Sequence, residues 1–173
     1  ADLAYIGSPW IATVEANARA KTIDYKTAER QRAVLETAIA QENELVDSDR
    51  ALRLAQQAVK RAPDLVPAVA LAARLLTKRG SLRAASKMVE RAFADAPHPE
   101  LAAAYLDMRP GDSNADRFAR AKTLAKLAPE NPESRIVLAR AALAARDFDS
   151  ARASMAPLVD AEAKPTARMC LLM

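Results

Sequence analysis

The fold is decided by residues 66–97, which read VPAVALAARLLTKRGSLRAASKMVERAFADAP. Small and apolar residues recur there at helical spacing, first at Val69, Ala72, Ala73 and Leu76. Gly80 ends this helix, because glycine readily adopts the left-handed backbone that follows many helices, and Ser81 can cap the next helix. The second helix ends before Pro97, and its inward residues are Ala85, Val89 and Ala92. The stretch therefore predicts two helices, A and B, joined by a turn.

The composition extends this prediction to the whole chain. Alanine makes up about a quarter of the 173 residues, whereas there are 3 glycines and 4% aromatic residues. Alanine has the lowest cost in a helix and glycine nearly the highest, so the composition favours helix. The β-formers are sparse and never alternate cleanly with polar residues, which excludes a sandwich, a barrel or a doubly wound sheet. Alanine at helix crossings also lets the two axes approach closely.

The prolines reveal an internal repeat. Pro63 and Pro97 lie 34 positions apart, and Pro97 and Pro129 lie 32 apart. The interval of 34 residues is that of the tetratricopeptide repeat (TPR), a helical hairpin that stacks on its neighbours. Residues 66–97 match the TPR pattern at the small pair Ala72-Ala73, at Gly80 and at the closing proline.

We therefore expect an all-α fold, a TPR-like right-handed superhelix of antiparallel helix pairs (an α-solenoid) with about ten helices. Residues 1–173 form a single solenoid in this prediction. Its parts are N-terminal helices in 9–31, repeats in 32–63, 66–97, 98–129 and 132–163, and a truncated helix in 165–173.

Three of the four repeats depart from the pattern. In the first, Leu35, Ala38 and Ile39 are expected to line helix A, and residues 47–49 to supply the turn and an N-cap. In the third, helix A is short, residues 99–108, and a turn at residues 109–113 (RPGDS) follows, with an N-cap for helix B at Asp112, Ser113 or Asn114. In the fourth, Arg146 stands where the turn glycine is usual, and Pro157 is expected to interrupt helix B.

The residues give no support for catalysis, for a metal site or for a cofactor. The chain has one histidine and one cysteine, His98 and Cys170, so a multi-histidine site, a cysteine cluster and a disulfide framework are excluded. His98, between two prolines, is interpreted as a turn or capping residue, and Cys170 as a buried structural thiol. Met88, Met108 and Met155 are expected in the core, and the carboxylates are dispersed. A net charge of +4, with signs mixed along the chain, indicates a solvated helical surface and predicts no nucleic-acid binding.

Several strings resemble one family. They are residues 62–68 (APDLVPA), 71–76 (LAARLL), 83–87 (RAASK), 97–102 (PHPELA), 109–113 (RPGDS) and 170–173 (CLLM). Together they look like the TPR region of bacterial HemY-type proteins, which are membrane-anchored and encoded with porphyrin-synthesis genes. The resemblance runs from about residue 16 to the end, and the strings at 109–113 and 170–173 are its most specific parts.

The resemblance implies a fragment of a longer protein. HemY-type proteins carry two N-terminal hydrophobic segments in the inner membrane, which implies that this region lies on the cytoplasmic side. It also implies protein partners among the enzymes of haem biosynthesis. A protoporphyrinogen oxidase of the same name needs a flavin and a Gly-x-Gly-x-x-Gly loop, and the three dispersed glycines exclude that activity here.

TPR proteins commonly bind partners through the groove lined by the A helices. The side chains expected there with polar chemistry are Glu36, Asn43, Arg74, Lys78, Arg109 and Arg140. The cations could take a carboxylate or an acidic segment, and arginine offers two parallel donors. The alternative is a set of solvated arginines without a partner. The string 109–113 has the same two interpretations, a capped turn or a partner-contact loop.

The sequence thus predicts a non-enzymatic interaction scaffold linked to haem biosynthesis. The alternative is a generic bacterial TPR adaptor or chaperone unconnected with haem. A helical-repeat RNA binder would show aromatic or Asn/Asp base-reading positions in each repeat, and none recurs. An enzyme would need a nucleophile or an acid/base pair.

Overall fold

The structure is a computed structural model that describes residues 3–159 and residue 167. Within these residues it is all-α, with nine helices and no strand. The helices are α1 (Leu3–Arg19), α2 (Tyr25–Asn43), α3 (Ser48–Arg61), α4 (Val66–Lys78), α5 (Leu82–Asp95), α6 (Pro99–Leu106), α7 (Asn114–Ala125), α8 (Pro132–Ala144) and α9 (Phe148–Val159). The count is one below the expected ten, and the expected helix in 165–173 lies outside the described residues apart from residue 167.

The chain divides into two compact units, Ala1–Ala92 (unit 1) and Phe93–Met173 (unit 2). Helix α5 contains the boundary between them. The prediction of one continuous solenoid over residues 1–173 stays a prediction.

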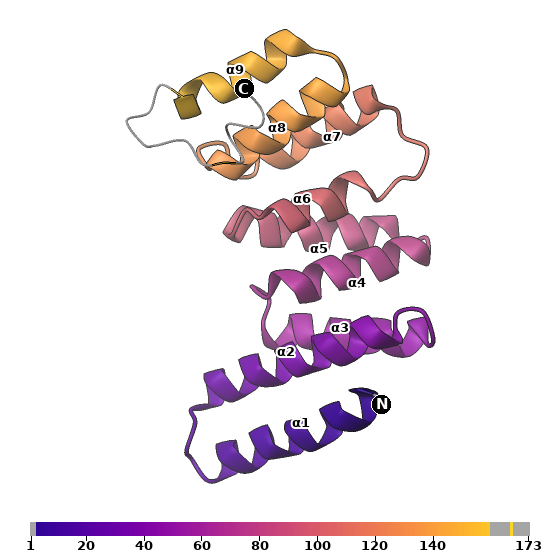
Figure 1. Ribbon diagram of the computed structural model, residues 1–173, viewed down its shortest axis with the longest axis vertical. Helices are drawn as coiled ribbons and strands as arrows, with labels where there is room; N and C mark the ends of the chain where they lie inside the picture. Colours follow the sequence, from indigo (N-terminus) through magenta and orange to yellow (C-terminus); the bar gives the residue numbers. More distant parts are fainter. Residues whose placement is uncertain (1–2, 160–166, 168–173) are drawn as a thin grey trace. The chain divides into compact units, whose positions relative to one another are not determined.

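Each unit is built from neighbouring helices that run back alongside one another (Figure 1). In unit 1, α2 packs on α1 and α3, and α3 packs on α4. In unit 2, α7 packs on α6 and α8, and α8 packs on α9. Alternate helices also touch, α2 with α4 and α6 with α8. The A helices of neighbouring hairpins therefore contact each other within both units.

The turn after α4 forms as the sequence predicts. Gly80 has φ +77°, the Ser81 amide donates to the Leu76 carbonyl at 2.9 Å, and the Gly80 amide donates to the Thr77 carbonyl at 2.9 Å. This is a Schellman motif, in which a left-handed residue lets the chain satisfy the last carbonyls of a helix.

The same motif closes α8 with an arginine in the glycine position. Arg146 has φ +58°, and the Asp147 amide donates to the Ala142 carbonyl at 2.9 Å. The turn therefore forms even though Arg146 replaces the glycine, as predicted. It carries a steric cost, because a residue with a side chain is strained in the left-handed conformation.

Side chains cap the N-termini of most of the described helices. Three confirm sequence expectations: Asp47 accepts from the Arg50 amide, His98 accepts from the Glu100 amide, and Ser113 forms a capping box with Asp116. Asp24 and Asn131 also cap α2 and α8. His98 is thus a capping residue, and residues 109–113 form a turn, with Gly111 at φ +95°, that leads into a capped helix.

The core consists largely of alanine. The predicted inward residues Val69, Ala72, Ala73 and Leu76 are buried, as are Ala85, Val89, Met108 and Met155. Ala92 and Met88, also predicted to be buried, are only half-buried. The α3 stripe Ala51, Ala55 and Ala58 is fully buried. In α2 the predicted register is wrong in part, because Ala38 is exposed and Leu35 only half-buried. Ala33, Glu36, Thr37 and Ala40 are buried instead. Two of these four residues are polar, so a search for apolar residues at helical spacing does not find the buried face of α2.

Two element boundaries differ from expectation. Helix α2 begins at Tyr25, inside the stretch 9–31 assigned to earlier helices, because Asp24 supplies its cap. The expectation that Pro157 interrupts the last helix B is wrong, since α9 continues through it to Val159. Proline removes its own amide and crowds the carbonyl four residues earlier. Here that carbonyl belongs to Ala153, an exposed residue whose surroundings water can reach.

Replacing Arg146 with glycine should stabilise the protein. The Arg146 side chain is exposed, so the substitution removes strain at φ +58° without removing buried contacts. We expect the free energy of unfolding to rise by roughly 1 kcal/mol in urea denaturation. The mirror variant Gly80→Ala should lose about as much, because an added Cβ at Gly80 meets no atom within 4 Å and only the backbone conformation is penalised. A loss of stability in Arg146→Gly would contradict this account.

Candidate functional site

In unit 1, two of the predicted groove cations share one carboxylate. Arg74 and Lys78 lie one turn apart on α4, and Glu44 is the C-cap of α2. The Arg74 Nη2 atom lies 2.9 Å from one Glu44 oxygen, and the Lys78 Nζ atom lies 2.7 Å from the other. The Arg74 Nε atom adds a second hydrogen bond at 3.2 Å. The pairing joins α2 to α4, the two A helices of this unit.

This arrangement strongly favours the ionised form of Glu44. The hydrogen bond from Arg74 has the largest effect, burial opposes it, and Lys78 adds a further hydrogen bond and charge. The pKa of Glu44 falls from its ordinary value to about 2. An acidic partner that binds Arg74 and Lys78 therefore competes with an internal carboxylate.

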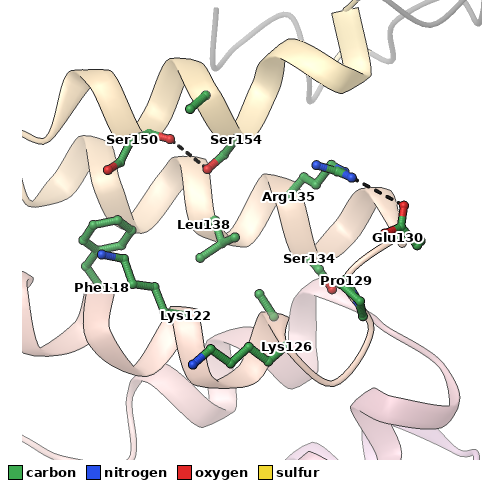
Figure 2. A pocket seen from close by; sticks show the side chains of 12 residues that line it. Phe118, Lys122, Lys126, Pro129, Glu130, Ser134, Arg135, Leu138, Ser150 and Ser154 are labelled. Atoms are coloured by element: carbon green, nitrogen blue, oxygen red, sulfur yellow. Dashed lines mark hydrogen bonds and ion pairs between the residues drawn. The ribbon is translucent and has the colours of Figure 1, made fainter.

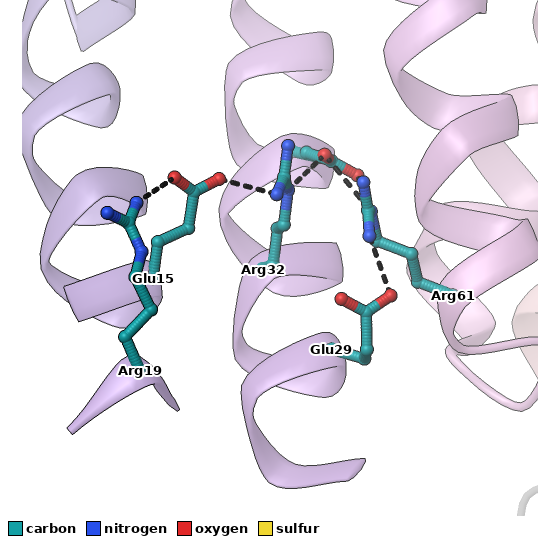
Figure 3. Close-up of polar contacts among 6 residues, drawn as sticks. Glu15, Arg19, Glu29, Arg32 and Arg61 are labelled. Atoms are coloured by element: carbon teal, nitrogen blue, oxygen red, sulfur yellow. Dashed lines mark hydrogen bonds and ion pairs between the residues drawn. The ribbon is translucent and has the colours of Figure 1, made fainter. Parts of the chain in front are cut away.

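Glu36 lies in a different environment from the one predicted. It is only 2% exposed, and its carboxylate oxygens accept from Arg32 of its own helix and from Arg61 of α3, both at 3.1 Å. Arg32 also pairs with Glu15 of α1, and Arg61 with Glu29 at 2.6 Å. The chain of charges joins α1, α2 and α3 (Figure 3). Glu36 thus holds helices together inside unit 1.

The fold favours the charged form of Arg61. Burial acts to lower the pKa of Arg61, but the hydrogen bond that Arg61 donates to Glu29 and the charges of Glu36 and Glu29 outweigh it and raise the pKa. Asn43 is also buried, and its Nδ2 atom donates to the Ile39 carbonyl at 2.7 Å. The Glu36 carboxylate and the Asn43 Nδ2 atom therefore meet partners within the unit.

In unit 2, the two A helices border a groove of about 260 Å³. Helix α6 contributes Ala103 and Leu106, α8 contributes Val137 and Arg140, and α7 contributes Asn114 at the base. Arg140 is exposed, and the structure gives it no ion pair among the residues described. Arg109 lies in the exposed turn after α6, outside the groove lining. The lining also includes Asp107, Arg117 and Glu133. Arg117 pairs with Asp107, so Arg140 is the cation that the groove offers beside its apolar wall.

The sequence did not indicate a second, larger pocket in unit 2. It measures about 550 Å³ and lies between α7, α8 and α9 (Figure 2). Ser134, Lys126, Arg135, Phe118 and Leu138 are among its lining residues. Ser134 is an ordinary helix residue in the sequence, and only its burial in the fold marks it.

Among the residues that the structure describes, no three histidine, cysteine or acidic side chains gather as metal ligands would. Cys170 lies outside the described residues.

No family model matches the chain, and no curated protein matches it. None of the described helices is both long enough and apolar enough to cross a membrane.

The free energy of unfolding should fall with pH below 4.5, in part because Glu44 becomes protonated there. Its folded pKa is depressed, so its contribution is complete above its unfolded value of 4.5 and is lost as pH falls toward about 2. We expect Glu44→Gln to be less stable than the wild type at pH 7, and the difference to shrink between pH 4.5 and pH 2. Urea denaturation of both proteins at each pH measures it. A difference that stays constant down to pH 2 would contradict the assignment.

Glu36→Gln should destabilise unit 1 more than Glu29→Gln does. Removing the charge at Glu36 leaves Arg32 and Arg61 facing one another near a buried amide, a loss of about 3 kcal/mol. Among the residues described, Glu29 pairs with Arg61 alone, and it is more exposed than Glu36, so we expect a loss of about 1 kcal/mol or less for its variant. Chemical denaturation with far-ultraviolet circular dichroism compares the two. Equal losses of unfolding free energy in the two variants would contradict the larger role that we assign to Glu36.

Proposed function

We propose that the chain is a non-enzymatic scaffold that docks protein partners along the A-helix grooves of a TPR-like, right-handed superhelix. The observation that carries the proposal is the groove between α6 and α8, where exposed Arg140 stands beside the apolar side chains of Leu106 and Val137. Contacts between alternate helices in both units support the stacking that such a superhelix requires.

The groove chemistry suits an acidic, partly apolar segment. An arginine can hold a carboxylate through two parallel hydrogen bonds, and the neighbouring apolar wall can bury a side chain of the partner. Arg74 and Lys78 extend the same preference to unit 1, once a partner carboxylate displaces Glu44.

For the partners, we infer enzymes of haem biosynthesis at the inner membrane, with this region on the cytoplasmic side of a longer, anchored protein. The support is the resemblance of residues 109–113 and of the neighbouring strings to HemY-type proteins. A generic bacterial adaptor is the alternative. Affinity capture with the full-length protein separates them, because haem-synthesis enzymes should be recovered in one case and unrelated clients in the other.

Arg140→Glu should weaken binding of a captured partner about tenfold or more, because it places like charge against an acidic segment. Calorimetric titration of the partner into wild type and variant measures the change. Arg152→Glu is the matched control, since Arg152 is an exposed arginine on α9 outside the groove lining. Equal affinities in both variants would overturn the groove assignment, provided that circular dichroism shows the same helix content.

A further inference from the structure

The pocket between α7, α8 and α9 contains an unsatisfied polar group. Ser134 is 1% exposed and lines the pocket, and its hydroxyl has no hydrogen-bond partner among the residues that the structure describes. A buried hydroxyl without a partner is costly, and native proteins rarely retain one. A ligand that bonds to this hydroxyl would remove the penalty.

Cations line the pocket as well as Ser134. They include Arg135 of α8 and Lys126, the C-cap of α7. Arg135 pairs with Glu130 at 3.6 Å, and the Glu130 side chain is almost fully exposed, so this pairing is weak. Ser134 also lies in the first turn of α8, where the helix dipole favours an anion.

Away from Ser134, large apolar side chains line the pocket beside Lys122, Ser150 and Ser154. Figure 2 shows Phe118 away from Ser134, with Leu138 between them. Ala125 of α7 and Ala153 of α9 complete this wall, and Lys122 lies over the Phe118 ring, 4.0 Å from its centroid. Across the whole pocket there are three cations and one carboxylate among the lining residues, and the pocket volume of about 550 Å³ falls within the range of small-molecule sites.

We propose that this pocket binds an amphipathic organic acid. Its carboxylate lies at Ser134, Lys126 and Arg135, and its apolar body lies along Leu138 and Phe118. A peptide fits less well, because its backbone amides would lie unpaired against the apolar wall. The site is distinct from the α6–α8 groove, so it does not depend on the proposed scaffold function.

Sodium octanoate and 1-octanol test the proposal as a matched pair that differs in the charged head. Calorimetric titration of the whole chain should give saturable 1:1 binding of octanoate, at least tenfold tighter than that of octanol. The absence of saturable octanoate binding, or equal affinity for the two, would overturn the proposal.

Variants of the pocket residues test where the carboxylate of octanoate binds. Lys126→Gln and Ser134→Ala should each weaken octanoate binding at least fivefold, and Ser134→Ala should at the same time raise the melting temperature, because it removes the unpaired hydroxyl. Arg152→Gln, which removes an equal charge outside the pocket, should bind octanoate as the wild type does. Unchanged affinity in both pocket variants, or an equal loss in Arg152→Gln, would overturn the assignment of this pocket.

Discussion

The structure depends on close contact between helices through alanine. Ala33 of α2, Ala58 of α3, Ala62 at the end of α3 and Ala68 of α4 form one buried cluster, each with at most 4% of its surface exposed. A methyl side chain adds little thickness, so the helix backbones approach closely and dispersion contacts accumulate along the crossing. The low glycine content and the turn at Gly80 follow the same requirement, because rigid helices must be joined by turns that bring them back alongside one another.

Close helices also bring charged side chains of different helices within reach. Glu36 meets Arg61 across the α2–α3 contact, and Glu44 meets Arg74 between α2 and α4. In unit 1 these pairings take up several polar groups that a groove could have offered to a partner. In unit 2 the equivalent helix pair leaves Arg140 exposed beside an apolar wall. The docking proposal therefore rests more on unit 2, and the pocket at Ser134 adds a chemically different site there.

Local features were predictable from the sequence wherever one residue determines the backbone. Gly80, His98 and Ser113 have the expected turn and capping roles, because left-handed φ and side-chain caps depend on neighbours in sequence. The register of α2 was less predictable, since two of its buried residues are polar and Glu36 is buried only because Arg32 and Arg61 approach it. Ser134 was not predictable at all, because its isolation from hydrogen-bond partners arises only when α7, α8 and α9 come together.

The most direct test of the central claim is the stability cost of enlarging an alanine at a helix contact. Ala58→Leu places three extra carbons in the buried cluster, and Ala38→Leu places the same carbons on the exposed face of α2. Urea denaturation should show that Ala58→Leu loses about 1–3 kcal/mol of unfolding free energy, whereas Ala38→Leu stays within about 0.5 kcal/mol of the wild type. Equal stability of the two variants would contradict the claim that close contact through alanine holds these helices together.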